Sequence, residues 1–71
     1  MQLTKDELLA IFGKIDNCAL ALSRSRQSIY QNIRNGEVSA ALTDTIIGWC
    51  IRNDMQKLPP RFIKAIAMAV L

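Results

Sequence analysis

The segment from Ser23 to Gly36, SRSRQSIYQNIRNG, holds three arginines and no acidic residue. Arginine guanidinium groups bind phosphates and pair with guanine, and glutamine amides can pair with adenine. A flexible basic tail, a phosphorylated Ser/Arg run and a helix facing a polyanion could each have this composition. Ile29 and Ile33 lie four positions apart, so in a helix their apolar side chains share one face. In a solvated tail this spacing would have no role. The spacing therefore favours the helix.

Residue types at its two ends define the limits of this helix. Ser25 is a good N-cap, and Gly36 occupies the position typical of a C′ residue, so we expect a helix over residues 26–34. Its outward face would then be polar and basic. An α-helix of this kind fits the major groove of DNA, where the residues near its N-terminus reach base edges.

A second short helix precedes this one and ends at about Leu22. Only residues 23–25 separate the two helices, and helices joined so tightly cross at a steep angle. Ala19 must be small because the following helix passes close over it. Leu22 and Ile29 form the apolar joint between the two helices.

The rest of the chain predicts an all-α domain of five helices spanning residues 1–71. The alternative for residues 42–51 is a pair of strands, because this stretch is rich in β-branched residues and contains a glycine. The starts of the expected helices outside the central pair are marked by the capping box of Thr4 and Glu7 (helix 5–12), by Ser39 (helix through Asn53) and by Pro60 (the last helix).

Composition excludes several classes of function. The 71 residues carry a net charge of +3 and contain no histidine, and the two cysteines, Cys18 and Cys50, lie far apart in apolar stretches. We therefore expect two buried thiols, no metal site, no cofactor and no catalytic centre, so the chain is not expected to be an enzyme. The acidic N-terminal segment is unlike a signal peptide, and the apolar stretch 65–71 is too short to span a bilayer. We expect a cytoplasmic protein that does not contact membranes.

The stretch FGKIDNCALALSRSRQSIYQNIRNG, residues 12–36, resembles the helix-turn-helix of the Cro family, small repressors of lambdoid bacteriophages. The resemblance covers residues 4–36. Residues 43–58, TDTIIGWCIRNDMQKL, resemble more weakly the fourth helix of the cII-type phage activators. Three positions depart from the family pattern: Ser23 replaces the usual glycine, Arg24 replaces an apolar residue and Asn32 replaces a core hydrophobe. The matching positions are the Phe-Gly pair after the first helix, Ala19, Leu22, Ser25, Ile29 and Gly36.

This resemblance implies a λ repressor-like fold that binds double-stranded operator DNA. Together with the charge and spacing of the third helix, it divides the polar residues into two groups. The residues expected to contact bases are Arg26, Gln27, Ser28, Tyr30 and Gln31. The residues expected to contact the DNA backbone are Lys14, Asn17, Arg24, Ser25 and Arg34.

One recognition helix contacts only a few base pairs, so we expect a homodimer, at least on DNA. Residues 59–71 are apolar on more than one face and are the candidate dimerisation helix. In the alternative, this tail is the fifth helix of a closed monomeric core. The residues expected at the dimer interface are Trp49, Phe62, Ile63, Ile66 and Val70.

The sequence thus predicts a phage or prophage Cro-type repressor in the bacterial host cytoplasm, with no small-molecule ligand. One alternative with the same chemistry is a cII-type activator. Another, of a different class, is a protein-interaction module such as an antirepressor. A membrane-active peptide is disfavoured because the basic residues and the apolar tail lie on different segments.

Overall fold

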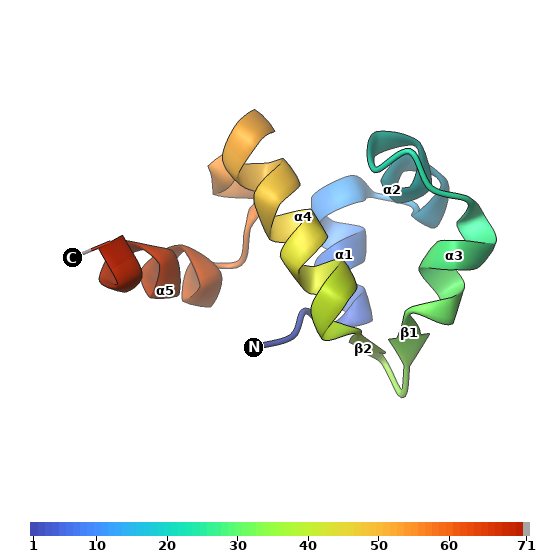
Figure 1. The fold of residues 1–71 in the computed structure, drawn as a ribbon, viewed down its shortest axis with the longest axis horizontal. Helices are drawn as coiled ribbons and strands as arrows, with labels where there is room; N and C mark the ends of the chain where they lie inside the picture. Colours follow the sequence, from blue (N-terminus) through green and yellow to red (C-terminus); the bar gives the residue numbers. More distant parts are fainter. Residues whose placement is uncertain (71) are drawn as a thin grey trace.

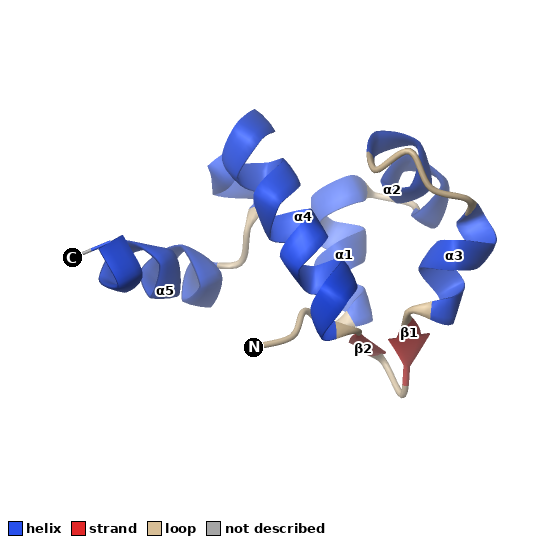
Figure 2. Ribbon diagram, in the orientation of Figure 1, coloured by secondary structure: helices blue, strands red, loops and turns tan. Residues whose placement is uncertain are grey.

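Five α-helices and one small β-hairpin make up the protein in the computed structural model, which describes residues 1–70 and only the backbone of Val70. Figure 1 shows α3 and α5 at opposite ends of the longest axis, with α1 and α4 between them. Figure 2 shows that strands occupy only the short hairpin next to α3. The elements in chain order are α1 (Lys5–Phe12), α2 (Ile15–Ala21), α3 (Arg26–Gln31), β1 (Ile33–Arg34), β2 (Glu37–Val38), α4 (Ala40–Asn53), the 3₁₀ turn η1 (Met55–Lys57) and α5 (Pro60–Val70).

The helix starts predicted from the sequence are confirmed. Thr4 and Glu7 form both hydrogen bonds of the capping box, at 2.9 and 3.1 Å. The Ser25 hydroxyl accepts from the N–H of Ser28 at 3.1 Å, and the Ser39 hydroxyl accepts from the N–H of Leu42 at 3.2 Å. Each cap satisfies a backbone donor that the first turn of a helix leaves without an intrahelical partner.

The predicted end of the third helix is wrong. The helix α3 ends at Gln31, and residues 33–38 form an antiparallel hairpin in which Ile33 pairs with Val38. Asn35 and Gly36 connect its strands with φ angles of 53° and 76°, the positive values that a type I′ turn requires at both central residues. Asn-Gly is the commonest pair for this turn, so Gly36 closes a hairpin and not a helix.

The strand alternative for residues 42–51 is also wrong, because this stretch lies within the helix α4. The last helix begins at Pro60 as predicted. Residues 59–70 of the expected dimerisation segment are therefore helical from Pro60 onward, while Leu71 lies outside the described residues.

Every helix contributes apolar side chains to one core. Ile29 of α3 is fully buried, as predicted, and so are both cysteines, which are free thiols. Burial raises the pKa of the Cys18 thiol to about 11, and the nearby Arg24 charge offsets only part of that rise. The core residues are Leu3, Leu8, Ile11, Phe12, Ile15, Cys18, Ala19, Ile29, Val38, Leu42, Ile46, Cys50, Leu58 and Phe62.

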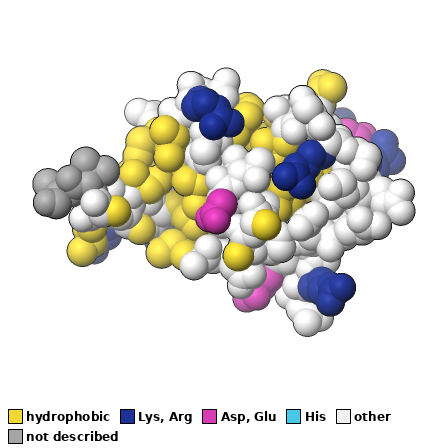
Figure 3. Space-filling model, in the orientation of Figure 1, with side chains coloured by type: hydrophobic (Ala, Val, Ile, Leu, Met, Phe, Trp, Pro, Cys, Tyr) yellow, Lys and Arg dark blue, Asp and Glu magenta, His cyan; other side chains and the backbone are white. Residues whose placement is uncertain are grey.

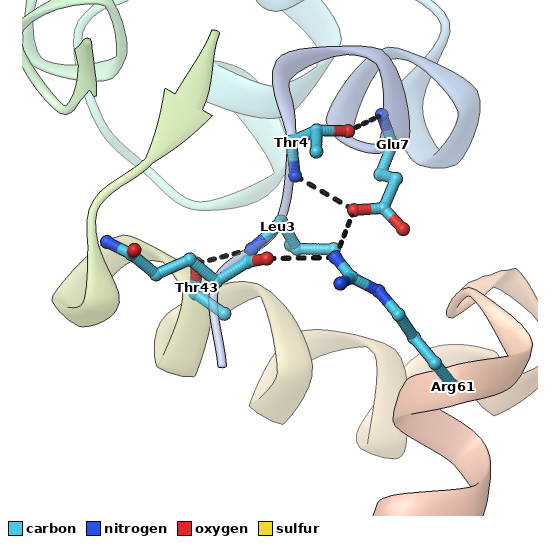
Figure 4. Close-up of polar contacts among 6 residues, drawn as sticks. Leu3, Thr4, Glu7, Thr43 and Arg61 are labelled. Carbon is cyan, nitrogen blue, oxygen red and sulfur yellow. Dashed lines mark hydrogen bonds and ion pairs between the residues drawn. The ribbon is translucent and has the colours of Figure 1, made fainter. Parts of the chain in front are cut away.

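Polar contacts tie α5 and α4 to the N-terminal segment (Figure 4). The Arg61 guanidinium donates to the Gln2 carbonyl at 2.9 Å and pairs with the Glu7 carboxylate at 2.6 Å. The buried Thr43 hydroxyl accepts from the N–H of Leu3 at 3.2 Å. Burial raises the pKa of Glu7, but the hydrogen bonds from Thr4 and Arg61 and the Arg61 charge outweigh this effect, so the pKa is lowered overall.

The apolar surface gathers at the α5 end of the molecule. Figure 3 shows hydrophobic side chains clustered where Figure 1 draws α4 and α5. Each of these helices carries one exposed large apolar side chain, Ile51 of α4 at 52% exposure and Met68 of α5 at 66%. The α5 part of this surface lies at the far end of the molecule from α3 (Figure 1).

Candidate nucleic-acid interface

A tight turn sets the angle between α2 and α3. Ser23 has a φ of 55°, so the position where the Cro pattern usually has glycine does adopt the left-handed conformation. That conformation costs a non-glycine residue about 1 kcal/mol. The N–H of Arg24 donates to the Ala19 carbonyl at 2.9 Å and closes the turn. Ala19 is buried at 6% exposure, which agrees with the expectation that a small residue is needed there.

Most of the polar side chains of α3 face solvent. Arg26, Gln27 and Gln31 are exposed, and Tyr30 is 50% exposed. Four of the five predicted base-contacting residues are therefore accessible. The buried Ile29 holds the helix against the body, so this face projects outward in a fixed orientation.

Ser28, the fifth predicted base-contacting residue, is half-buried and takes part in local hydrogen bonds. Its N–H donates to the Ser25 cap, and its carbonyl accepts from the Asn32 side chain at 2.7 Å. Ser28 therefore helps to end and cap α3, and it is less accessible than its four neighbours.

Arg26 is paired with an acid on the neighbouring helix. Its Nε lies 2.6 Å from Oδ1 of Asp16, which is in the first turn of α2. Residue spacing did not predict this pair, because ten residues separate the two positions and only the tight turn brings them together. An acid near the start of one short helix and an arginine at the start of the next is the signal that could have indicated it.

The predicted backbone-contacting residues lie along α2, the turn and β1, and all five are exposed. Lys14 is the N-cap residue of α2, and Arg34 is on β1 next to the hairpin turn. The Asn17 amide is already used within the chain, since its Nδ2 donates to the Phe12 carbonyl at 3.0 Å. The Ser25 hydroxyl likewise accepts the α3 cap bond, and its proton remains available to donate to a phosphate.

Asn32 stands where the Cro pattern usually has an apolar residue, and its polar side chain has a structural role here. Its side chain donates to the Ser28 carbonyl and accepts from the Ser39 hydroxyl at 2.8 Å, so it links the end of α3 to the start of α4. Beside it lies an open polar hollow of about 300 Å³. The hollow extends the polar surface of α3 toward the hairpin, and it is lined by Gln2, Gln31, Asn32, Arg34, Asn35, Glu37 and Ser39.

The predicted dimer-interface residues do not share one surface. Phe62 is 2% exposed and belongs to the core of its own chain, as the alternative of a tail packed on the monomer requires. Trp49 is half-buried against Phe12, with ring centroids 5.0 Å apart. Ile63 and Ile66 are half-buried on α5, and the Val70 side chain lies outside the described part of the chain.

The described residues contain neither a metal-ligand cluster nor a membrane-spanning helix. Among residues 1–70, no three histidine, cysteine or acidic side chains come together as metal ligands. No helix in that range has the length and apolar character needed to cross a bilayer.

No family model matches the chain, and no curated protein or solved structure gives a significant match. The resemblance to the Cro family therefore stays a prediction.

Proposed function

We propose that this protein is a sequence-specific DNA-binding transcriptional regulator of the Cro type, acting as a repressor in the cytoplasm of a bacterial host. One observation carries the proposal: α3 is held against the body by Ile29 and presents Arg26, Gln27, Tyr30 and Gln31 to solvent beside a tight turn that carries Arg24. In this proposal α2, the turn and α3 form a helix-turn-helix. No cofactor or catalytic step is needed.

In the proposed complex α3 lies in the major groove with its N-terminal turn toward the bases. Arg26 then pairs with guanine and Gln27 with adenine, the pairings that their donors and acceptors fit. Lys14 and Arg24 flank one end of the helix, and Arg34 lies beyond the other, where they bind phosphates and fix the register. Bound in this way across a promoter, the protein excludes polymerase by occupancy.

A DNA-binding measurement over a salt series tests the proposal. Duplexes enriched from a random pool are compared with random DNA of the same length. We expect tighter binding to the enriched duplexes and a steep loss of affinity with salt, because each neutralised phosphate releases counterions. Equal and weak binding to both at low salt would contradict the proposal.

Two substitutions divide the roles within the site. We expect Gln27→Ala to relax the base preference at one position and leave the salt slope unchanged. We expect Arg34→Ala to weaken binding to all DNA alike and to reduce the salt slope by about one unit. If Gln27→Ala reduced the salt slope and Arg34→Ala changed a base preference, Gln27 would contact phosphate and Arg34 a base. A cII-type activator would give the same binding results, and transcription from the bound promoter distinguishes the two.

The exposed apolar residues Ile51 and Met68 favour a second candidate function, a protein-interaction module such as an antirepressor. In that case the α4–α5 surface binds another regulator, and DNA binding is absent. In the leading proposal the same surface serves homodimerisation.

A further inference from the structure

The ion pair between Asp16 and Arg26 joins the carboxylate to Nε and leaves the Arg26 side chain 63% exposed. The Asp16 carboxylate lies 2.6 Å from Nε of Arg26. Nη1 and Nη2, at the end of the group, each carry an outward N–H that can donate to another partner. Guanine presents O6 and N7 side by side in the major groove, and two parallel N–H donors match them.

We infer that Asp16 is a positioning residue that holds Arg26 ready to read guanine. The inference rests on the proposed function and assigns Asp16 a role in specificity. The side chains are 63% exposed at Arg26 and 58% exposed at Asp16, and exposed pairs of this kind add little to folding stability. Their effect on binding is different, because a side chain that is already ordered loses less conformational freedom when it binds.

The charge of Asp16 adds a second effect. A carboxylate next to the DNA-facing end of α3 repels phosphates and weakens binding to any sequence, whereas it supports the guanidinium geometry that one base requires. Specificity is a difference of affinities, so a residue that lowers random binding and keeps guanine binding increases it. Asp16 therefore lowers the affinity for DNA of any sequence and raises the preference for guanine.

The variant Asp16→Asn tests this, with Asp44→Asn as the matched control. Both remove one negative charge, and Asp44 is an exposed residue on α4. Duplexes enriched by the wild-type chain are varied at the position whose preference is lost in Arg26→Ala. The dissociation constant is measured for each base at that position, and thermal unfolding shows that each variant is folded.

We expect Asp16→Asn to bind random DNA at least as tightly as the wild type and to lower the guanine preference by about twofold to fivefold, the coupling typical of an exposed ion pair. Asp44→Asn should keep the preference. In the Arg26→Ala background, Asp16→Asn should change no base preference, because the group that Asp16 positions is gone.

Three results would overturn the inference. The guanine preference could survive in Asp16→Asn while Arg26→Ala loses it, the two asparagine variants could behave alike, or Arg26→Ala could cost no base preference at all. If the wild-type chain enriches no sequence from the pool, the proposed function fails and the inference fails with it. Enrichment followed by one of the first three results rejects the role of Asp16 alone.

Discussion

At the scale of single residues, the buried Cys18 thiol makes stability depend on alkaline pH. The pKa of this thiol is about 11 in the folded protein and 9.0 in the unfolded chain. Below pH 9 both states keep the proton and the contribution to stability is complete. As the pH rises from 9 toward 11 the unfolded chain loses its proton first, so the free energy of unfolding falls, by about 2–3 kcal/mol in total.

The variant Cys18→Ala isolates this effect. We expect it to be less stable at pH 7, because a buried side chain is shortened, and to lose less stability than the wild type between pH 9 and 11. Denaturant unfolding under reducing conditions across that range measures the difference. Burial also raises the pKa of Cys50, so Cys50→Ala should show a change of the same sign. Parallel stability curves for wild type and Cys18→Ala would contradict the assignment.

At the scale of elements, residue types predicted the helix starts, because these depend on contacts between residues close together in the chain. Thr4, Ser25 and Ser39 cap helices because each hydroxyl accepts from an N–H only three residues ahead and needs no partner far along the chain. The hairpin was missed because the four-residue spacing of Ile29 and Ile33 fits a helix, and a positive φ at Gly36 fits a helix end as well as a turn.

Contacts between elements could not be read from spacing. The pairing of Arg61 with Glu7 spans 54 residues, and that of Arg26 with Asp16 depends on the crossing of two helices. In the candidate site, the exposed face of α3 could therefore be predicted. The pairing of Arg26 with Asp16 and the hydrogen bond between Asn32 and Ser39 could not be predicted from the sequence.

Asn35 provides a test that separates the observed hairpin from the predicted helix. Its φ of 53° favours asparagine or glycine, so we expect Asn35→Ala to lower the free energy of unfolding by about 1 kcal/mol. Asn35→Gly is the control and should change stability little, because glycine adopts positive φ freely. If residue 35 were helical, alanine would stabilise the protein and glycine would destabilise it. Denaturant unfolding of the two variants decides between these outcomes.

The link between α5 and α1 makes stability depend on acidic pH. The pKa of Glu7 is lowered in the folded state, so its contribution is present above the unfolded value of 4.5 and is lost as the pH falls through the folded value. We expect Glu7→Gln to cost roughly 1 kcal/mol at pH 7 and nothing once the pH is low enough to protonate the wild-type carboxyl.

Unfolding free energies measured from pH 7 to pH 2 test this dependence. Arg61→Gln should only partly reduce the loss of stability in acid, since the hydrogen bond from the Thr4 N–H to the Glu7 carboxylate remains. Asp6→Asn is the control, because it removes a carboxylate from the same turn of α1. A loss for Glu7→Gln that stays constant with pH would show that the carboxylate charge is not what stabilises this link.

At the scale of the whole molecule, the positions of α3 and α5 constrain the proposed dimer. The two helices lie at opposite ends of a molecule 37 Å long (Figure 1). A two-fold dimer through α5 would place the α3 helices at its outer ends, and they must enter major grooves one DNA turn, about 34 Å, or a multiple of it apart. The half-site spacing in enriched DNA therefore reports the angle between the two subunits.

Met68 offers a way to test the dimer without unfolding the monomer. Truncation before α5 would remove Phe62 from the core, whereas Met68 is 66% exposed and can be changed without loss of packing. We expect Met68→Lys to weaken dimerisation at least tenfold in sedimentation equilibrium, because a charge would be buried at the interface. Leu20→Lys, the same kind of change at an 82% exposed residue of α2, should leave the dimer intact. A dimer unchanged by Met68→Lys would place the interface elsewhere, and a wild-type chain that stays monomeric even on DNA would leave the α4–α5 surface to a different protein partner.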